Sequence, residues 1–131
     1  MIPIDPFSII GSAVASYLGT AGTVPVYQDL AVQGSQPPYV IYSHQSAPEI
    51  YTWDGSEVQA EYQVKVVSNR ENSAEATRLY KEVHAVMQDA PLSLGDGVSL
   101  LRCRRIATVK YQDSQRFWHV GGIYRIDVIS N

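Results

Sequence analysis

Residues 36–43 read QPPYVIYS, and this stretch indicates more about the fold than any other part of the chain. Proline has no backbone N–H to donate, so the pair at positions 37 and 38 marks the end of a connection. The Tyr, Val and Ile residues that follow are enriched in β-strands. We therefore predict a strand over residues 39–45, which Pro48 ends.

Two elements are predicted before this strand. Apolar residues recur at helical spacing over residues 6–18, and Asp5 can cap the free amide groups at the start of this helix. Gly19 offers a left-handed stop after it. A short strand is predicted over residues 24–27, and it belongs at a sheet edge because Pro25 cannot donate to a ladder.

The clearest strand covers residues 57–68, where apolar and polar side chains alternate as in an antiparallel sheet covered on one side. A second helix is predicted to begin at Asn72, with Glu75 completing a capping box, and to run to Met87. Residues 98–111 and 117–130 are predicted to form a long hairpin. The glycine pair at 121 and 122 indicates a bulge or a bend in its second strand.

The predicted order of elements is α-β-β-β-α-β-β, which does not alternate as a doubly wound parallel sheet does. We predict an α+β fold, with a mostly antiparallel sheet of about four to five strands and two helices packed on one face. The 131 residues fit one domain, covering residues 1–131, that buries about two thirds of its unfolded surface.

Composition narrows the possible partners. The net charge of −3 argues against a dedicated binder of nucleic acid or anionic membrane. The single cysteine excludes an intrachain disulfide, and no apolar run approaches the roughly 20 residues of a membrane span. We therefore expect a soluble protein of a reducing cytoplasm, or one assembled there, with no membrane partner.

No catalytic, cofactor-binding or metal-binding motif is found. His44, His84 and His119 lack the spacing of metal ligands, and no phosphate-binding or nucleophile motif is present. A nucleophilic pair of Cys103 with a histidine is conceivable. The favoured interpretation of Cys103 is a small core residue on a strand.

Two groups of residues are candidates for contacts with a partner. The first is the arginine cluster, which is either a solvated face or a contact with a neighbouring protein; nucleic acid is less favoured because no aromatic residues are interleaved. The second is a set of large apolar residues near predicted turns, including a hairpin connection over residues 48–55 closed by an Asp-Gly turn. These residues either contact a partner or fold back onto the sheet. The candidates are Arg102, Arg104 and Arg105 in the first group, and Ile50, Tyr51, Trp53, Phe117 and Trp118 in the second.

In the order and spacing of these elements, the chain resembles the tail-completion or tail-terminator proteins of long-tailed bacteriophages, which belong to the siphophage neck. Residues 24–27 followed by PPYVIY look like the opening of that family. Residues 64–68 with the helix after them look like its centre, and residues 124–128 look like its closing strand. The patterns are diffuse, and the resemblance depends on their order over nearly the whole chain.

The resemblance implies a structural virion protein, not an enzyme, that assembles in the host cytoplasm. Six copies would form a homo-oligomeric ring at the head-proximal end of the tail tube, where the ring stops tube polymerisation and joins tail to head. The implied partners are the tail tube protein and a head-completion or connector protein. Genomic DNA would pass through the lumen without specific binding. The family's pattern contains no catalytic residues and implies no cofactor.

Two alternatives remain open from the sequence. The chain could be a head-completion or connector protein, one layer closer to the head. It could instead be a small enzyme or ligand-binding domain that uses Cys103, His119 and the arginines.

Overall fold

The alternation of apolar and polar side chains in residues 57–68 builds the central strand of the sheet, β4 (Gly55–Ser68). The computed structural model describes residues 11–19, 24–46, 49–52, 55–89, 92, 94 and 98–130. Their helices and strands follow in the order α1 (Gly11–Leu18), β1 (Val26–Gln28), β2 (Tyr39–Ser46), β3 (Glu49–Thr52), β4, α2 (Ala74–Met87), β5 (Val98–Gln112) and β6 (Trp118–Ser130).

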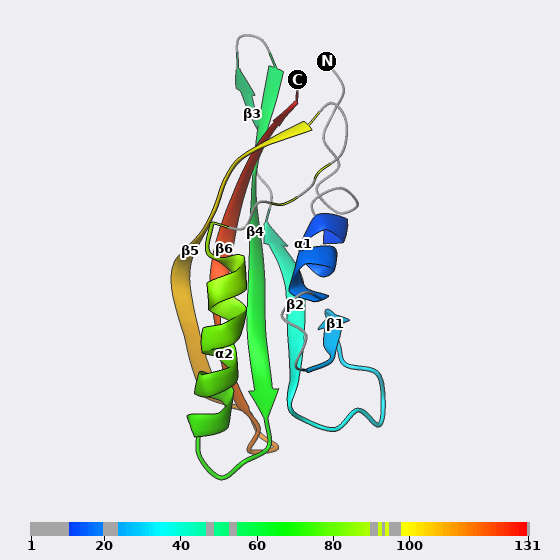
Figure 1. Cartoon of the computed structure of the whole chain (residues 1–131), viewed down its shortest axis with the longest axis vertical. Helices are drawn as coiled ribbons and strands as arrows, with labels where there is room; N and C mark the ends of the chain where they lie inside the picture. The colour runs from blue at the N-terminus through cyan, green and yellow to red at the C-terminus, as the bar shows by residue number, and fades with distance from the viewer. Residues whose placement is uncertain are drawn as a thin grey trace.

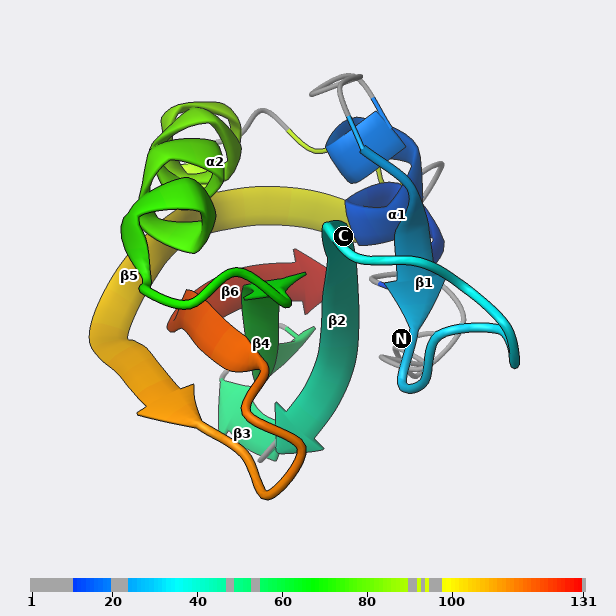
Figure 2. The same cartoon turned by 90° about the horizontal axis from the view of Figure 1, so that it is seen from below.

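The strands form one sheet with the order β1-β2-β4-β6-β5, and β3 pairs with the beginning of β4 beside this path. The β1–β2 ladder is parallel, and the other ladders are antiparallel. Both helices lie on one face of the sheet (Figure 1), and the sheet is strongly twisted and curved (Figure 2). The predicted α+β class, the mostly antiparallel sheet and the placement of two helices on one face are confirmed.

The core lies between the helices and the face of the sheet that carries the apolar set of β4. The opposite set of β4, which includes Gln59 and Lys65, is only partly buried, as the alternation predicts. Burying a valine-sized side chain contributes roughly 1.5–3 kcal/mol, so this face supplies much of the driving force for folding. Its central members are Val58, Ala60, Tyr62, Val64 and Val66 of β4, Tyr124, Ile126 and Val128 of β6, and Leu79, Val83 and Met87 of α2.

The first helix and first strand follow the sequence prediction with two differences. The described part of α1 begins at Gly11, and the predicted start at residues 5–10 lies outside the described residues. Gly19 does not have a positive φ, so the predicted left-handed stop is wrong. The edge position of the first strand is confirmed: among the described strands, β1 pairs with β2 alone, and the carbonyl of Pro25 accepts a hydrogen bond of 2.8 Å from the Val40 amide.

One half of the predicted cap of the second helix is confirmed, because Asn72 Oδ1 accepts a hydrogen bond of 3.0 Å from the Ala74 amide. The other half is wrong, because Glu75 does not complete a capping box. The helix begins at Ala74, two residues after Asn72, and Ser73 makes no side-chain capping bond. Glu75 instead accepts a hydrogen bond of 2.8 Å from the Ser68 hydroxyl and pairs with Arg70. The carboxylate therefore ties the helix to the end of β4. Within the described residues, neither helix is long and apolar enough to cross a membrane.

Strand β3 is not predicted from the sequence. Residues 48–55 were predicted as a hairpin connection, yet Ile50 and Tyr51 lie on β3 and pair with Glu57 and Ser56 of β4. The connection between these strands is therefore shorter than predicted. Trp53, at its centre, lies outside the described residues.

The glycine pair of β6 does not form the predicted bulge. The β4–β6 ladder continues through Gly121 and Gly122 without a register shift. A side chain at Gly121 would meet the Val64 carbonyl and would lie 2.5 Å from the Lys65 Cα, and one at Gly122 would lie 2.5 Å from the Tyr80 hydroxyl. The pair lets the neighbouring backbone and α2 approach β6 closely.

Gly121→Ala is expected to destabilise the fold by about 1–3 kcal/mol, because the added methyl group meets backbone atoms of β4 that cannot move cheaply. Gly19→Ala is the matched control, since nothing lies within 4 Å of a side chain there. Urea unfolding of both variants measures the difference. Equal midpoints for Gly121→Ala and the unmodified protein would show that the ladder accommodates a methyl group.

Candidate assembly surfaces

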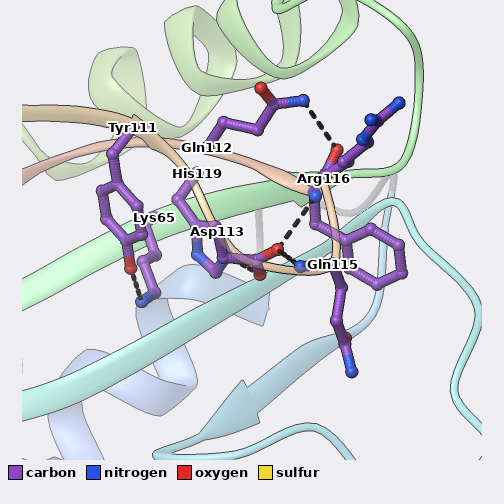
Figure 3. A network of polar contacts seen from close by, with 8 residues as sticks. Lys65, Tyr111, Gln112, Asp113, Gln115, Arg116 and His119 are labelled. Carbon is purple, nitrogen blue, oxygen red and sulfur yellow. Dashed lines mark hydrogen bonds and ion pairs between the residues drawn. The ribbon is translucent and has the colours of Figure 1, made fainter.

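Asp113 organises the turn that joins β5 to β6 (Figure 3). Its Oδ1 accepts hydrogen bonds from the backbone amides of Gln115 and Phe117, at 2.9 and 3.0 Å. Its Oδ2 lies 2.8 Å from Nε2 of His119. The hydrogen bond with His119, assisted by the two backbone amides, lowers the pKa of Asp113 below its usual value. One carboxylate thus fixes the shape of this end of the molecule.

A short stack extends the turn network across the sheet. The rings of Tyr111 and His119 are stacked, with centroids 4.5 Å apart and planes 7° apart. The Tyr111 hydroxyl accepts a hydrogen bond of 2.9 Å from Nζ of Lys65 on β4 (Figure 3). The face of the sheet turned away from the helices therefore carries ordered side chains at this end.

A cavity of about 330 Å³ lies near the same turn, lined by Asn69, Arg70, Glu71, Gln112 and Arg116. Its lining comes from the β4–α2 connection and from the β5–β6 hairpin. These side chains include no nucleophile, and Arg70 is already paired with Glu75. The cavity is a polar depression, and its side chains suit contact with another protein surface better than catalysis.

A buried carboxylate orders the arginines of the predicted cluster. Asp127 is fully buried, with Nε of Arg102 2.7 Å from its Oδ2 and Nε of Arg125 3.0 Å from its Oδ1. The Arg102 guanidinium forms a close ion pair with Asp127. Its N–H does not point at Oδ2, so the contact is not a hydrogen bond. Arg102 and Arg104 are both exposed on the face away from the core, whereas Arg105 is half-buried on the opposite face.

Arg105 belongs to a chain of polar groups under α2. It donates a hydrogen bond of 3.3 Å to the Tyr80 hydroxyl, which lies 2.6 Å from the Tyr124 hydroxyl. The Tyr124 hydroxyl lies 2.8 Å from Nδ1 of His84. Burial raises the pKa of Tyr124 strongly, and its bond with Tyr80 adds to the shift. Burial, and then the charge of Arg105, lower the pKa of His84.

The enzyme alternative used Cys103, His119 and the arginines, and the structure does not bring Cys103 and His119 together. Cys103 is buried in the core, and its thiol donates to the Met87 carbonyl at 3.3 Å. His119 lies on the other face of the sheet, paired with Asp113. His44 contacts the edge of the Tyr62 ring. Within the described ranges, no group of metal-ligating side chains occurs.

The apolar candidates are distributed over the two ends of the molecule. Ile50 and Tyr51 lie on β3, whereas Phe117 and Trp118 lie where the hairpin turn enters β6. Trp118 is half-buried against the core, and its indole donates to the Glu71 carbonyl at 3.3 Å. Figure 1 shows β3 and the β5–β6 turn at opposite ends of the long axis.

Several exposed apolar residues were not singled out by the sequence analysis. They are large hydrophobic side chains on connections and on an edge strand, where single exposed residues are common. A sequence signal was available for two of them, because Leu30 and Val32 stand in a connection that is otherwise polar or rich in Gly, Ser and Pro. The described set is Leu30, Val32, Leu101, Ile106 and Tyr111.

A comparison with known protein families identifies the kind of protein to which this fold belongs. Residues 11–127 match the family described as tail completion protein gp17, so the chain belongs to this family. It is a structural tail-completion component of a phage-like virion and not an enzyme, as the sequence predicted.

A solved structure supports the fold. A chain from the structure titled "Virion of native gene transfer agent (GTA) particle" superposes with a TM-score of 0.80 at 15% sequence identity. The match covers 95% of this chain and 99% of that one. At this identity the similarity shows the fold alone. A comparison with the curated proteins found no match.

Asp113→Ala is expected to lower stability by about 1–2 kcal/mol, because two backbone amides and His119 lose their acceptor. Gln115→Ala serves as the control, since Gln115 is exposed and joins the network through its backbone. Thermal unfolding measures both variants. Equal melting temperatures for the two would show that the turn holds its shape without the carboxylate.

His84 is expected to make stability depend on pH. Its folded-state pKa lies below the ordinary value of 6.5, so the unfolded chain binds the proton first. Above pH 6.5, His84 does not lower the free energy of unfolding. As the pH drops through 6.5, the free energy of unfolding falls, and it stops falling once the pH is below the folded-state pKa of His84. Melting temperature measured from about pH 8 to about pH 5 should fall more for the unmodified protein than for His84→Gln. Identical slopes would contradict the assignment.

Proposed function

We propose that this protein is a tail terminator: a ring of six copies at the head-proximal end of the tail tube, which stops tube polymerisation and joins the tail to the head. The observation that carries the proposal is membership of the tail completion family over residues 11–127. Six is the number that the resemblance in sequence implies.

The sheet suits assembly into a ring. Among the described strands, β1 and β5 stand at the two edges of the sheet, and each pairs along one side. A domain with two unlike open edges can repeat around a closed axis, each copy meeting the next in the same way. Permanent interfaces of this kind often bury about 2,000 Å² or more, which a 15-residue edge strand can help to supply.

The two ends of the molecule suit contacts above and below the ring. β3, which includes Ile50 and Tyr51, lies at one end, and the β5–β6 turn, where Phe117 and Trp118 are found, lies at the other. With the long axis roughly along the tail, one end would face the tube protein and the other the head-completion protein. Arg102 and Arg104, which are exposed between the two ends, would then face a neighbouring subunit or the lumen.

The charge of the chain suits a channel for DNA. Each copy carries −3, so six copies carry 6 × −3 = −18. A net negative ring repels phosphate, which lets the genome pass without specific binding.

The test is to add the purified protein to tail tube subunits that are elongating, and to follow tube length by negative-stain imaging. The expected result is a ring on one end of each tube and an arrest of growth at that end. The protein must be tested with tubes present, since a terminator that is monomeric alone can still assemble on a tube end.

Unchanged elongation with bare tube ends would overturn the proposal. Cross-linking of the protein to portal-side proteins, with none to the tube protein, would place it instead in the head-completion layer.

A further inference from the structure

The charges of this chain are divided between its two halves. Residues 1–64 contain no Lys or Arg, and all of their formal charge is acidic. Residues 65–131 contain all ten of the basic residues but seven of the thirteen acidic ones, which gives +3. The acidic residues of the first half are Asp5, Asp29, Glu49, Asp54, Glu57 and Glu61, which give −6.

The fold places the two halves on opposite sides of the molecule. The first half supplies β1 and β2, and the second half supplies β5 and β6. In both views of the fold, β1 with its following loop lies on one side and β5 on the other (Figures 1 and 2). The β5 strand contains four basic residues and no acidic one. The β1–β2 loop, residues 29–38, contains Asp29 as its only charged residue. The sheet therefore has one basic edge and one weakly acidic edge.

Exposed apolar side chains stand on both of these edges. Leu30 and Val32 in the β1–β2 loop are 81% and 66% exposed, the highest values among the large hydrophobic residues described. On β5, Leu101 and Ile106 are 52% and 46% exposed. Each edge thus offers two apolar residues within a short stretch, on opposite sides of one chain.

Two bulges turn the apolar residues of β5 outward. The register of β5 with β6 shifts between Leu100 and Arg102 and again between Arg105 and Ala107, so Leu101 and Ile106 have no partner in the ladder. A bulge re-aims a side chain and also blocks the addition of another strand to an edge. The β5 edge is thereby suited to contact through side chains and unsuited to extending the sheet.

We infer that neighbouring copies in the ring meet through these unlike edges, with Leu30 and Val32 of one copy packed against Leu101 and Ile106 of the next. This inference rests on the proposed ring and names its interface. Opposite charge on the two edges guides the pairing, and the exposed cations Arg104 and Lys110 of β5 repel a second β5. A contact between unlike edges uses both edges of every copy, so it repeats until the ring closes.

Cross-linking tests this geometry. Val32→Cys and Ile106→Cys are introduced singly and together, and the proteins are treated with a short bis-maleimide in the presence of tail tube subunits. The native Cys103 is buried and contributes little to the reaction. The double variant should give a ladder of covalent oligomers that ends at the size of the ring. A mixture of the two single variants should give dimers and nothing larger.

The controls separate this contact from chance encounters. Val32→Cys combined with Lys81→Cys, which is exposed on α2, should give at least about tenfold less cross-linked product. The product from the edge pair should decrease as salt is raised, because the opposite charges are then screened.

Three results would overturn the inference. Dimers formed by one single variant alone would show that like edges meet. A double variant that stays monomeric while rings are imaged on tube ends would refute the interface and leave the terminator function standing. A monomeric double variant with bare, growing tube ends would refute the ring itself, and the interface with it.

Discussion

The antiparallel ladder between β4 and β6 is the interaction on which the rest of the structure depends. It pairs the strands from Glu57↔Ile129 to Ser68↔Trp118 without a shift in register. The lack of a side chain at Gly121 lets β6 lie close to β4, and the lack of one at Gly122 leaves room for Tyr80 of α2 on the core face. The same ladder fixes which side chains of each strand face the core and which face outward. A slip of one residue would exchange the two faces and remove the core.

The β4–β6 ladder also lies between the strands of the two halves of the chain in the sheet. Strands β1 and β2 lie on one side of it, and β5 on the other. The first half of the chain, which is acidic overall, and the basic strand β5 therefore reach separate edges of the sheet. A chain arranged in this way is suited to repeating itself around an axis, in keeping with its tail completion family.

The polar side chains described above stabilise turns and the packing of neighbouring elements, and they do not form a catalytic arrangement. Asp113 shapes a turn, Asp127 holds Arg102 and Arg125, and the Tyr80–Tyr124 hydroxyl pair ties α2 to β6. Each of these titratable or polar groups is occupied by a neighbour in the fold, and the one cysteine is in the core. This use of polar side chains is what a structural component of a virion requires, because a precise surface depends on ordered turns and edges.

The element order of the larger strands and helices could be predicted from the sequence, because their apolar periodicities are local and strong. The short strand β3 was missed because four residues give little periodicity and because its pairing with β4 decides its state. The predicted capping box failed because Ser68 and Arg70 compete for Glu75. The arginine candidates were found as a run in the sequence, whereas Leu101 and Ile106 were not, since their exposure comes from bulges that form only when β5 pairs with β6.

The sequence by itself determined the α+β class, the alternating central strand, the apolar face of α2 and the absence of a catalytic motif. It also determined the division of charge between the two halves. Only the tertiary structure decided that these halves become opposite edges of one sheet, and that Cys103 and His119 lie on opposite faces. The physical reason is that periodicity and charge are properties of neighbouring residues. Register, curvature and edge position instead arise from pairing between strands that are distant in the chain.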